Sequence, residues 1–203
     1  DPNRIWVFAN AKFDMHMLAN MGVHIAGKVW CTQVMHSLLF EEMSHKLKDM
    51  AKHLLGWRWS DFQDTFGKIT EQFSPLELIQ KAERENFPLL VEYAANDAWG
   101  TLGCFLDLVP RLQSAITHSL FRDCPPYIET LWDLFYKVES RYTKVLWKME
   151  RNGVLIDTSY LARIQPQALR EIEDLEIAIT REVGWRMNVK STPDLRHYFF
   201  DQC

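Results

Sequence analysis

Between residues 128 and 149 an apolar side chain recurs at every third or fourth position, which is the spacing of one face of an α-helix. The face consists of Ile128, Leu131, Trp132, Phe135, Val138, Tyr142, Val145, Leu146 and Met149. Asn152-Gly153 follows and is typical of a helix end. The sequence therefore predicts a long amphipathic helix here.

The part of the chain before residue 122 is predicted to contain one strand and several helices. The short apolar run Ile5–Ala9 is typical of a buried strand. Residues 57–73 are aromatic and irregular and are predicted as a loop. Ser74-Pro-Leu-Glu77 is the clearest helix start, with Ser as N-cap, Pro in the first turn and Glu as capping-box partner. Other helices are predicted over 15–21, from Val29–Trp30 through 34–40, over 45–55, and from near Pro88 towards Pro110.

Residues beyond 153 are predicted to be mainly helical. After a short extended piece at 154–156, Asp157 or Thr158 caps a helix that Pro166 should kink or break. Ser191 starts a last helix with Pro193 in its first turn. With one or two strands against many helices, the predicted fold class is α/β and helix-rich.

Arg122-Asp-Cys-Pro-Pro126 is the strongest linker signal in the chain. It predicts a first domain over 1–122, a linker over 123–126 and a second domain over 127–203.

Composition narrows the class of protein. Hydrophobic residues make up 47% of the 203 residues, enough for a packed core. No run of ~20 apolar residues could span a bilayer, and no secretory signal opens the chain. We therefore expect a soluble cytoplasmic protein with no membrane partner. The four cysteines form no CxxC pair, which argues against a zinc site or a disulfide framework.

Two short motifs contain side chains suited to metal-dependent chemistry. Tyr93 and Asp97 lie four residues apart and therefore share one helix face. A carboxylate can bind Mg²⁺ or Mn²⁺, and a nearby phenol can orient a water molecule. Asp14, after the first strand, is a second candidate ligand, and Asn10 could bond a phosphate oxygen. Alternatively, Asp14 is the N-cap of the helix over 15–21, and Tyr93 and Asp97 are an ordinary surface pair.

A row of basic residues flanks the apolar face of the long helix. Lys144 and Lys148 are its central members, and the full row is Lys137, Arg141, Lys144, Lys148 and Arg151. The row could contact a DNA backbone or an acidic neighbouring domain, or it could be a solvated surface. The aromatic residues Trp57, Trp59, Phe62 and Phe66 could stack on unpaired bases or pack beneath a loop.

These motifs, taken in order, resemble family A DNA polymerases, the group of bacterial DNA polymerase I and many phage replicases. Asn10-x-x-Phe-Asp14 is similar to their second exonuclease motif, and Tyr93-x-x-x-Asp97 to their third. Residues 45–56 resemble the helix between these motifs. Glu150–Asp157 resembles the start of the polymerase domain, and Asn188–Leu195 resembles the segment that opens the thumb. Cys31-Thr32 stands where the family often has Asp-Thr.

The resemblance implies a partial ribonuclease H-like 3'–5' exonuclease domain, followed by helices that lead into the polymerase thumb. It implies that Asp97 binds a first Mg²⁺ or Mn²⁺ ion and that Asp14 helps to hold a second. Tyr93 would orient the attacking water, and Asn10 would contact the terminal nucleotide. The implied reaction is hydrolysis of the 3'-terminal phosphodiester of a frayed strand. The implied partners are single-stranded 3' ends, primer–template DNA and the remainder of the polymerase.

One departure from the family pattern limits these expectations. The family has Asp-x-Glu on a strand upstream of the second motif, and this chain begins after that point. We therefore expect the chain alone to be inactive, as a fragment of a phage or bacterial polymerase. The main alternative is a non-catalytic exonuclease-like scaffold or single-stranded DNA binding module. A second alternative, an all-helical interaction protein, would lack the strand at Ile5–Ala9 and would hold Asp14 far from Asp97.

Overall fold

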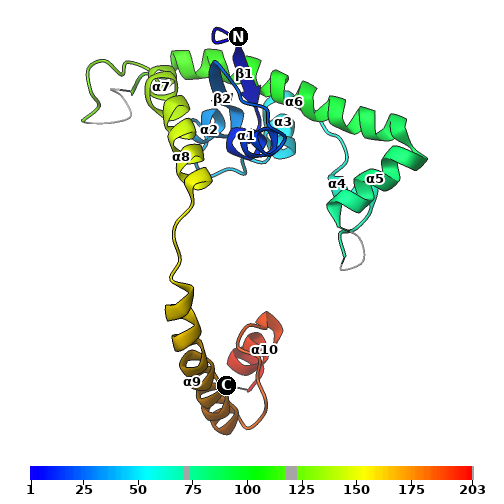
Figure 1. Ribbon diagram of the computed structural model, residues 1–203, viewed down its shortest axis with the longest axis vertical. Helices are drawn as coiled ribbons and strands as arrows, with labels where there is room; N and C mark the ends of the chain where they lie inside the picture. Colours follow the sequence, from blue (N-terminus) through cyan, green and yellow to red (C-terminus); the bar gives the residue numbers. More distant parts are fainter. Residues whose placement is uncertain (71–73, 118–122, 203) are drawn as a thin grey trace. The chain divides into compact units, whose positions relative to one another are not determined.

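The computed structural model describes residues 1–70, 74–117 and 123–202. It divides the chain into two compact units, Asp1–Gly153 and a smaller one that starts at Val154. Figure 1 shows the helices and strands of both units.

A two-stranded parallel sheet lies in the first unit. Strand β1, Ile5–Phe8, pairs with β2, Lys28–Cys31, with Ile5 opposite Lys28 and Phe8 opposite Cys31. Parallel neighbours need a crossover connection, and helix α1, Ala11–Asn20, lies within it. The strand predicted at the start of the chain is confirmed, but it is not buried: Ile5 is exposed and Trp6, Val7 and Phe8 are half-buried.

The predicted helix start at Val29–Trp30 is wrong. Both residues belong to β2 and are buried, and the helix that follows begins only at Thr32. A short apolar run has no period that separates a buried strand from a buried helix. Residues 28–31 form a strand because they pair with β1, and nothing in their own sequence indicates that pairing.

Among the described residues, five helices follow the sheet up to Ser114. They are α2 (Thr32–Ser37), α3 (Leu47–Leu55), α4 (Phe62–Phe66), α5 (Pro75–Glu85) and α6 (Phe87–Ser114). The capping box between Ser74 and Glu77 is present as predicted, and α6 continues through Pro110. The predicted loop over 57–73 is wrong where α4 forms, and its residues 71–73 lie outside the described part of the chain.

The long helix predicted over 128–149 forms as one helical run with a change of pitch. It consists of α7 (Leu131–Leu134), a π-helical turn η2 (Phe135–Glu139) and α8 (Ser140–Asn152). Gly153 follows with φ 70°, a left-handed value that a glycine adopts without strain.

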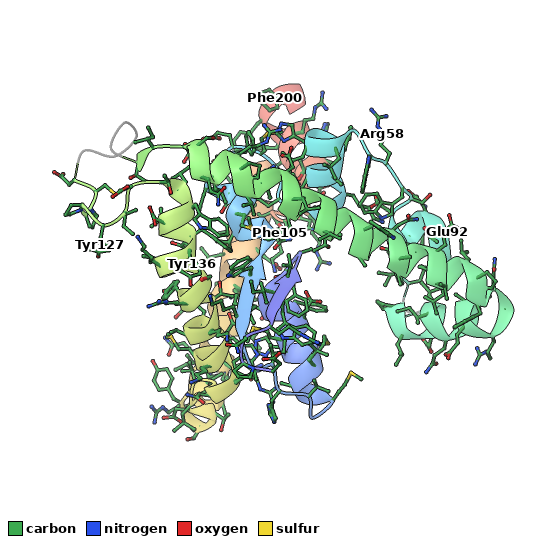
Figure 2. The ribbon with its side chains drawn as sticks, turned by 90° about the horizontal axis from the view of Figure 1, so that it is seen from above. Arg58, Glu92, Phe105, Tyr127, Tyr136 and Phe200 are labelled. Carbon is green, nitrogen blue, oxygen red and sulfur yellow. The ribbon has the colours of Figure 1, made fainter. Side chains whose placement is uncertain are left out.

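Trp30 occupies the centre of the larger hydrophobic cluster of this unit. Its ring centroid lies 5.6 Å from that of Phe105 on α6 and 5.3 Å from that of Trp132 on α7. The ring of Tyr136 lies 6.4 Å away; Phe105 and Tyr136 are labelled in Figure 2. The sheet is therefore held between α6 and the α7–α8 run through β2.

The second unit contains two helices and a terminal π-helical segment. Helix α9 spans Thr158–Val183 with Asp157 as N-cap, and α10 spans Thr192–Arg196 with Ser191 as N-cap, as predicted. The segment η3 covers His197–Gln202. Pro166 does not break α9. The helix is exposed around this residue, so water can satisfy the carbonyl group that a proline leaves without its hydrogen bond.

The predicted domain boundary at 123–126 stays a prediction. In the structure the first compact unit continues past these residues and ends at Gly153. No helix in the described part of the chain is long and apolar enough to cross a membrane.

His36 is a buried titratable group in the α2–α3 region. It is fully buried, and its Nδ1 lies 2.8 Å from Nδ1 of His45. Its ring lies 5.8 Å from that of His53. Burial, together with the charges of His45 and His53, lowers the pKa of His36 from 6.5 to about 4.

This lowered pKa predicts a loss of stability in mild acid. Below pH 6.5 the unfolded chain binds a proton at His36 that the folded chain takes up only near pH 4. The free energy of unfolding should therefore fall by up to about 3 kcal/mol between pH 6.5 and 4 from this group alone. Denaturant unfolding followed by tryptophan fluorescence should show a shallower pH dependence for His36→Met. The exposed control His24→Gln should match the wild type, and equal slopes for all three proteins would contradict the prediction.

Candidate active site

The junction between β1 and α1 positions the first two predicted site residues. Helix α1 begins at Ala11, so Asn10 is its N-cap residue, and Asp14 lies in its first turn. The alternative that Asp14 is an N-cap is therefore wrong. Asn10 is exposed, and its side chain makes no capping hydrogen bond. Its amide is thus available to a ligand in the described structure.

Asp14 and Asp97 line the same cleft although 83 positions separate them in the sequence. The cleft has a volume of about 400 Å³. Its lining consists of Val7, Phe8, Ala9, Asp14, Leu47, Asp97, Ala98, Thr101 and Leu102. The cleft therefore lies where the end of β1, α1, α3 and α6 meet. The strand at the start of the chain and this shared cleft both contradict the alternative of an all-helical interaction protein.

The electrostatics of the cleft favour a cation. Burial raises the pKa of the Asp14 carboxyl above its usual range, because a desolvated carboxylate is less stable. The described lining of the cleft contains two carboxylates and no basic side chain. A divalent cation would offset the electrostatic repulsion between the two carboxylates in the cleft.

Asp97 is fixed by two contacts on α6 and the loop after α3. The indole Nε1 of Trp59 donates to Oδ1 of Asp97 over 2.8 Å. Thr101 Oγ1 donates to the Asp97 backbone carbonyl over 2.8 Å. None of the described residues hydrogen-bonds the second carboxylate oxygen, Oδ2, so one oxygen is oriented and the other is available.

Tyr93 lies one helical turn before Asp97 but lines a different hollow. This neighbouring hollow has a volume of about 790 Å³ and includes Arg58 and Glu92, both labelled in Figure 2. The Tyr93 hydroxyl accepts a hydrogen bond from Lys48 Nζ over 3.3 Å. The structure therefore brings Asp14 and Asp97 into one cleft and places Tyr93 beside it.

Two glycines of α6 leave room for the tryptophans of the loop after α3. A Cβ atom on Gly100 would overlap Trp59 Cη2 and lie 3.0 Å from Cζ2 of the same ring. A Cβ atom on Gly103 would lie 3.2 Å from Trp57 Cζ3. Both indoles can therefore lie directly against the helix backbone. Trp59 and Trp57 pack on the molecule itself, although Trp57 remains 45% exposed.

Lys144 and Lys148, predicted to bind DNA, lie on α8 facing the sheet and α1. Lys144 Nζ donates to the backbone carbonyl of Gly27, and burial followed by the charge of Lys148 lowers the pKa of its ammonium. Both lysines line a hollow of about 320 Å³ with Trp147. Further along α8, Glu150 lies 2.5 Å from Lys12 of α1. Part of the basic row thus attaches α8 to its own unit, and DNA contact by Lys144 and Lys148 stays a prediction.

The predicted site omitted Lys48. Its Nζ contacts the Tyr93 hydroxyl, the Ser60 carbonyl and, over 3.5 Å, the carboxylate of Asp61. Trp59 was considered only for stacking or packing. No spacing within 48–61 indicates these contacts, since they depend on the packing of α3 against α6.

The residues present fit part of a divalent metal site. Carboxylate oxygens are the ligands that Mg²⁺ and Mn²⁺ prefer, and Asp14 and Asp97 supply two carboxylates. Within residues 1–70, 74–117 and 123–202, however, no group of three or more His, Cys, Asp or Glu side chains is arranged to hold a metal ion. Further ligands would have to come from elsewhere.

Comparison with known proteins shows which family the chain belongs to. Residues 1–113 match the family described as 3'-5' exonuclease. The chain therefore belongs to the 3'–5' exonuclease domain family of family A DNA polymerases, and the resemblance inferred from the motifs is confirmed.

Curated relatives extend the similarity over the whole chain. DNA polymerase I of Chloroflexus aurantiacus is 30% identical over 194 residues, which cover 94% of this chain and 18% of that protein. DNA polymerase I of Pseudomonas aeruginosa is 29% identical over 209 residues, covering 100% and 20%. The rice protein DNA polymerase I A, chloroplastic, is 28% identical over 234 residues, covering 98% and 22%. The chain spans about a fifth of the length of these relatives.

The partly buried charge of Asp14 should lower stability when no cation is bound. Asp14→Asn replaces a desolvated carboxylate by a neutral amide of similar shape. In metal-free buffer at neutral pH the midpoint of thermal unfolding should rise by about 2–4 °C. Calorimetry measures this change, and the exposed control Asp123→Asn should leave the midpoint unchanged. A lower midpoint for Asp14→Asn would mean that the carboxylate stabilises the fold.

Proposed function

We propose that this chain supplies part of a metal-dependent proofreading exonuclease, which hydrolyses the 3'-terminal phosphodiester of DNA. The observation that supports this most directly is the meeting of Asp14 and Asp97 in one cleft. The two carboxylates come from the second and third motifs of the family, and the family match covers both.

The proposed roles follow the positions of the side chains. Asp97 and Asp14 hold Mg²⁺ or Mn²⁺, which when bound neutralises charge that develops on the phosphate oxygens. Asn10, exposed at the start of α1, contacts the terminal nucleotide. Tyr93 orients the attacking water from the neighbouring hollow. Water adds across the terminal P–O bond, so a nucleoside monophosphate leaves and the shortened strand keeps a 3'-hydroxyl.

The proposal extends to the parent protein. The parallel β1–β2 pair is consistent with one edge of a ribonuclease H-like sheet, and the remaining carboxylates would come from an upstream Asp-x-Glu. The relatives named DNA polymerase I support a parent that also synthesises DNA and binds primer–template. The 203-residue chain alone is then inactive.

A non-catalytic role as an exonuclease-like scaffold or single-stranded DNA binding module is the second candidate. It is favoured by one observation, the presence of fewer than three clustered metal-binding side chains among the described residues. In that case the chain would bind single-stranded 3' ends equally well with and without a divalent ion.

Removal of one carboxylate tests the catalytic proposal. In the complete polypeptide that carries this chain, Asp97→Asn should slow release of nucleoside monophosphate by roughly a hundredfold or more. The assay follows a labelled single-stranded oligonucleotide in Mg²⁺ or Mn²⁺. Asp107→Asn is the matched control, because Asp107 lies on the same helix and pairs with Arg111 at 2.6 Å.

Two results would contradict the proposal. Equal rates for the wild type and Asp97→Asn would remove Asp97 from the reaction. A wild-type protein that binds single strands without any metal-dependent hydrolysis would favour the scaffold role.

A further inference from the structure

We infer that Trp59 and Lys48 are positioning residues for Asp97 and Tyr93, and that they hold both groups through the loop after α3. This inference rests on the proposed metal-dependent function. It adds two side chains outside the Asn10–Asp14 and Tyr93–Asp97 motifs.

Trp59 acts on Asp97 through one hydrogen bond. The indole N–H occupies Oδ1 at 2.8 Å, which fixes the rotation of the carboxylate and leaves Oδ2 for a cation. Groups that orient a metal ligand in this way commonly change metal affinity by about 10–100-fold when they are removed. An indole N–H only donates, so it can never compete with Asp97 for the cation.

The position of the indole is set by Gly100. The Trp59 ring lies so close to the α6 backbone that a Cβ atom at residue 100 would overlap it. Gly100 follows Asp97 by three residues, so the ring and the carboxylate are on adjoining parts of the same turn. The absence of a side chain at Gly100 is thus what lets the indole reach Asp97.

Lys48 links the loop after α3 to Tyr93. Its side chain is only 19% exposed, and Nζ lies 4.5 Å above the Tyr93 ring and 5.8 Å above the Trp59 ring. The same ammonium bonds the Tyr93 hydroxyl and the Ser60 carbonyl. One cation therefore fixes the phenol directly and holds the backbone next to Trp59.

The competing explanation is that both residues only pack the loop. Trp59→Phe separates the two explanations, because phenylalanine retains an aromatic ring against Gly100 but loses the N–H donor. Trp57→Phe is the matched control, since that indole lies across Gly103 on the next turn.

Mn²⁺ binding to the complete polypeptide that carries this chain tests the role of Trp59. Free Mn²⁺ is measured by electron paramagnetic resonance during a titration, with thermal unfolding as a check on the fold. For Trp59→Phe we expect the apparent Kd to rise about tenfold with an unfolding midpoint near that of the wild type. Gly100→Ala, which leaves Trp59 intact but displaces it, should raise the apparent Kd in the same direction. Trp57→Phe should bind as the wild type does.

The outcomes distinguish this inference from the function on which it rests. If Asp97→Asn binds Mn²⁺ as the wild type does, the metal assignment itself is wrong and both fall. If Asp97→Asn loses binding while Trp59→Phe and Gly100→Ala bind normally, the proposed function stands and the positioning role of Trp59 is overturned.

A double-mutant comparison tests Lys48. In the complete polypeptide, Lys48→Met and Tyr93→Phe should each lower kcat by about tenfold with little change in KM. Combined, they should cost no more than the larger single effect, because both remove one interacting pair. Lys48→Arg, which keeps the cation, should restore most of the rate. If the two losses of rate multiply in the double variant, or if Lys48→Arg does not restore the rate, then Lys48 has only a packing role.

Discussion

The parallel pairing of β1 with β2 is the constraint on which the candidate site depends. It places the end of β1 beside α6, so that Asp14 in the first turn of α1 lines the same cleft as Asp97. The buried β2 residue Trp30 packs between α6 and α7 and so holds the sheet against both helices. Through this packing, the sheet and the helices around it bring into one cleft two carboxylates that are remote in sequence.

A second layer of contacts refines this arrangement. The cleft contributes two carboxylates, while α3 and the loop after it contribute two donors, the Lys48 ammonium and the Trp59 indole. Donors and acceptors therefore come from different segments. The attachment of α8 through Lys144 to Gly27 holds the far side of the sheet. Hydrogen bonds from the α3 region and from α8 thus add to the packing of the core.

Local chemistry made some elements predictable from the sequence. The Ser74–Glu77 capping box and the helix end at Gly56 depend on a few neighbouring residues, and both form as expected. The motif residues were found because their spacing resembles a known family. Strand β2 could not be found in this way, because its identity depends on a partner more than 20 positions away. Lys48 was missed for the same reason, since its contacts depend on how α3 lies against α6.

Helix α6 joins the hydrophobic core and the candidate chemistry in a single rigid element of 28 residues. Its later turns bury Cys104, Leu108 and Leu112, and its earlier turns bear Tyr93 and Asp97. A helix transmits a shift along its axis from one end to the other, and one residue of register corresponds to about 1.5 Å. A substitution of the buried Leu108 should therefore also displace Asp97, although Leu108 does not line the cleft.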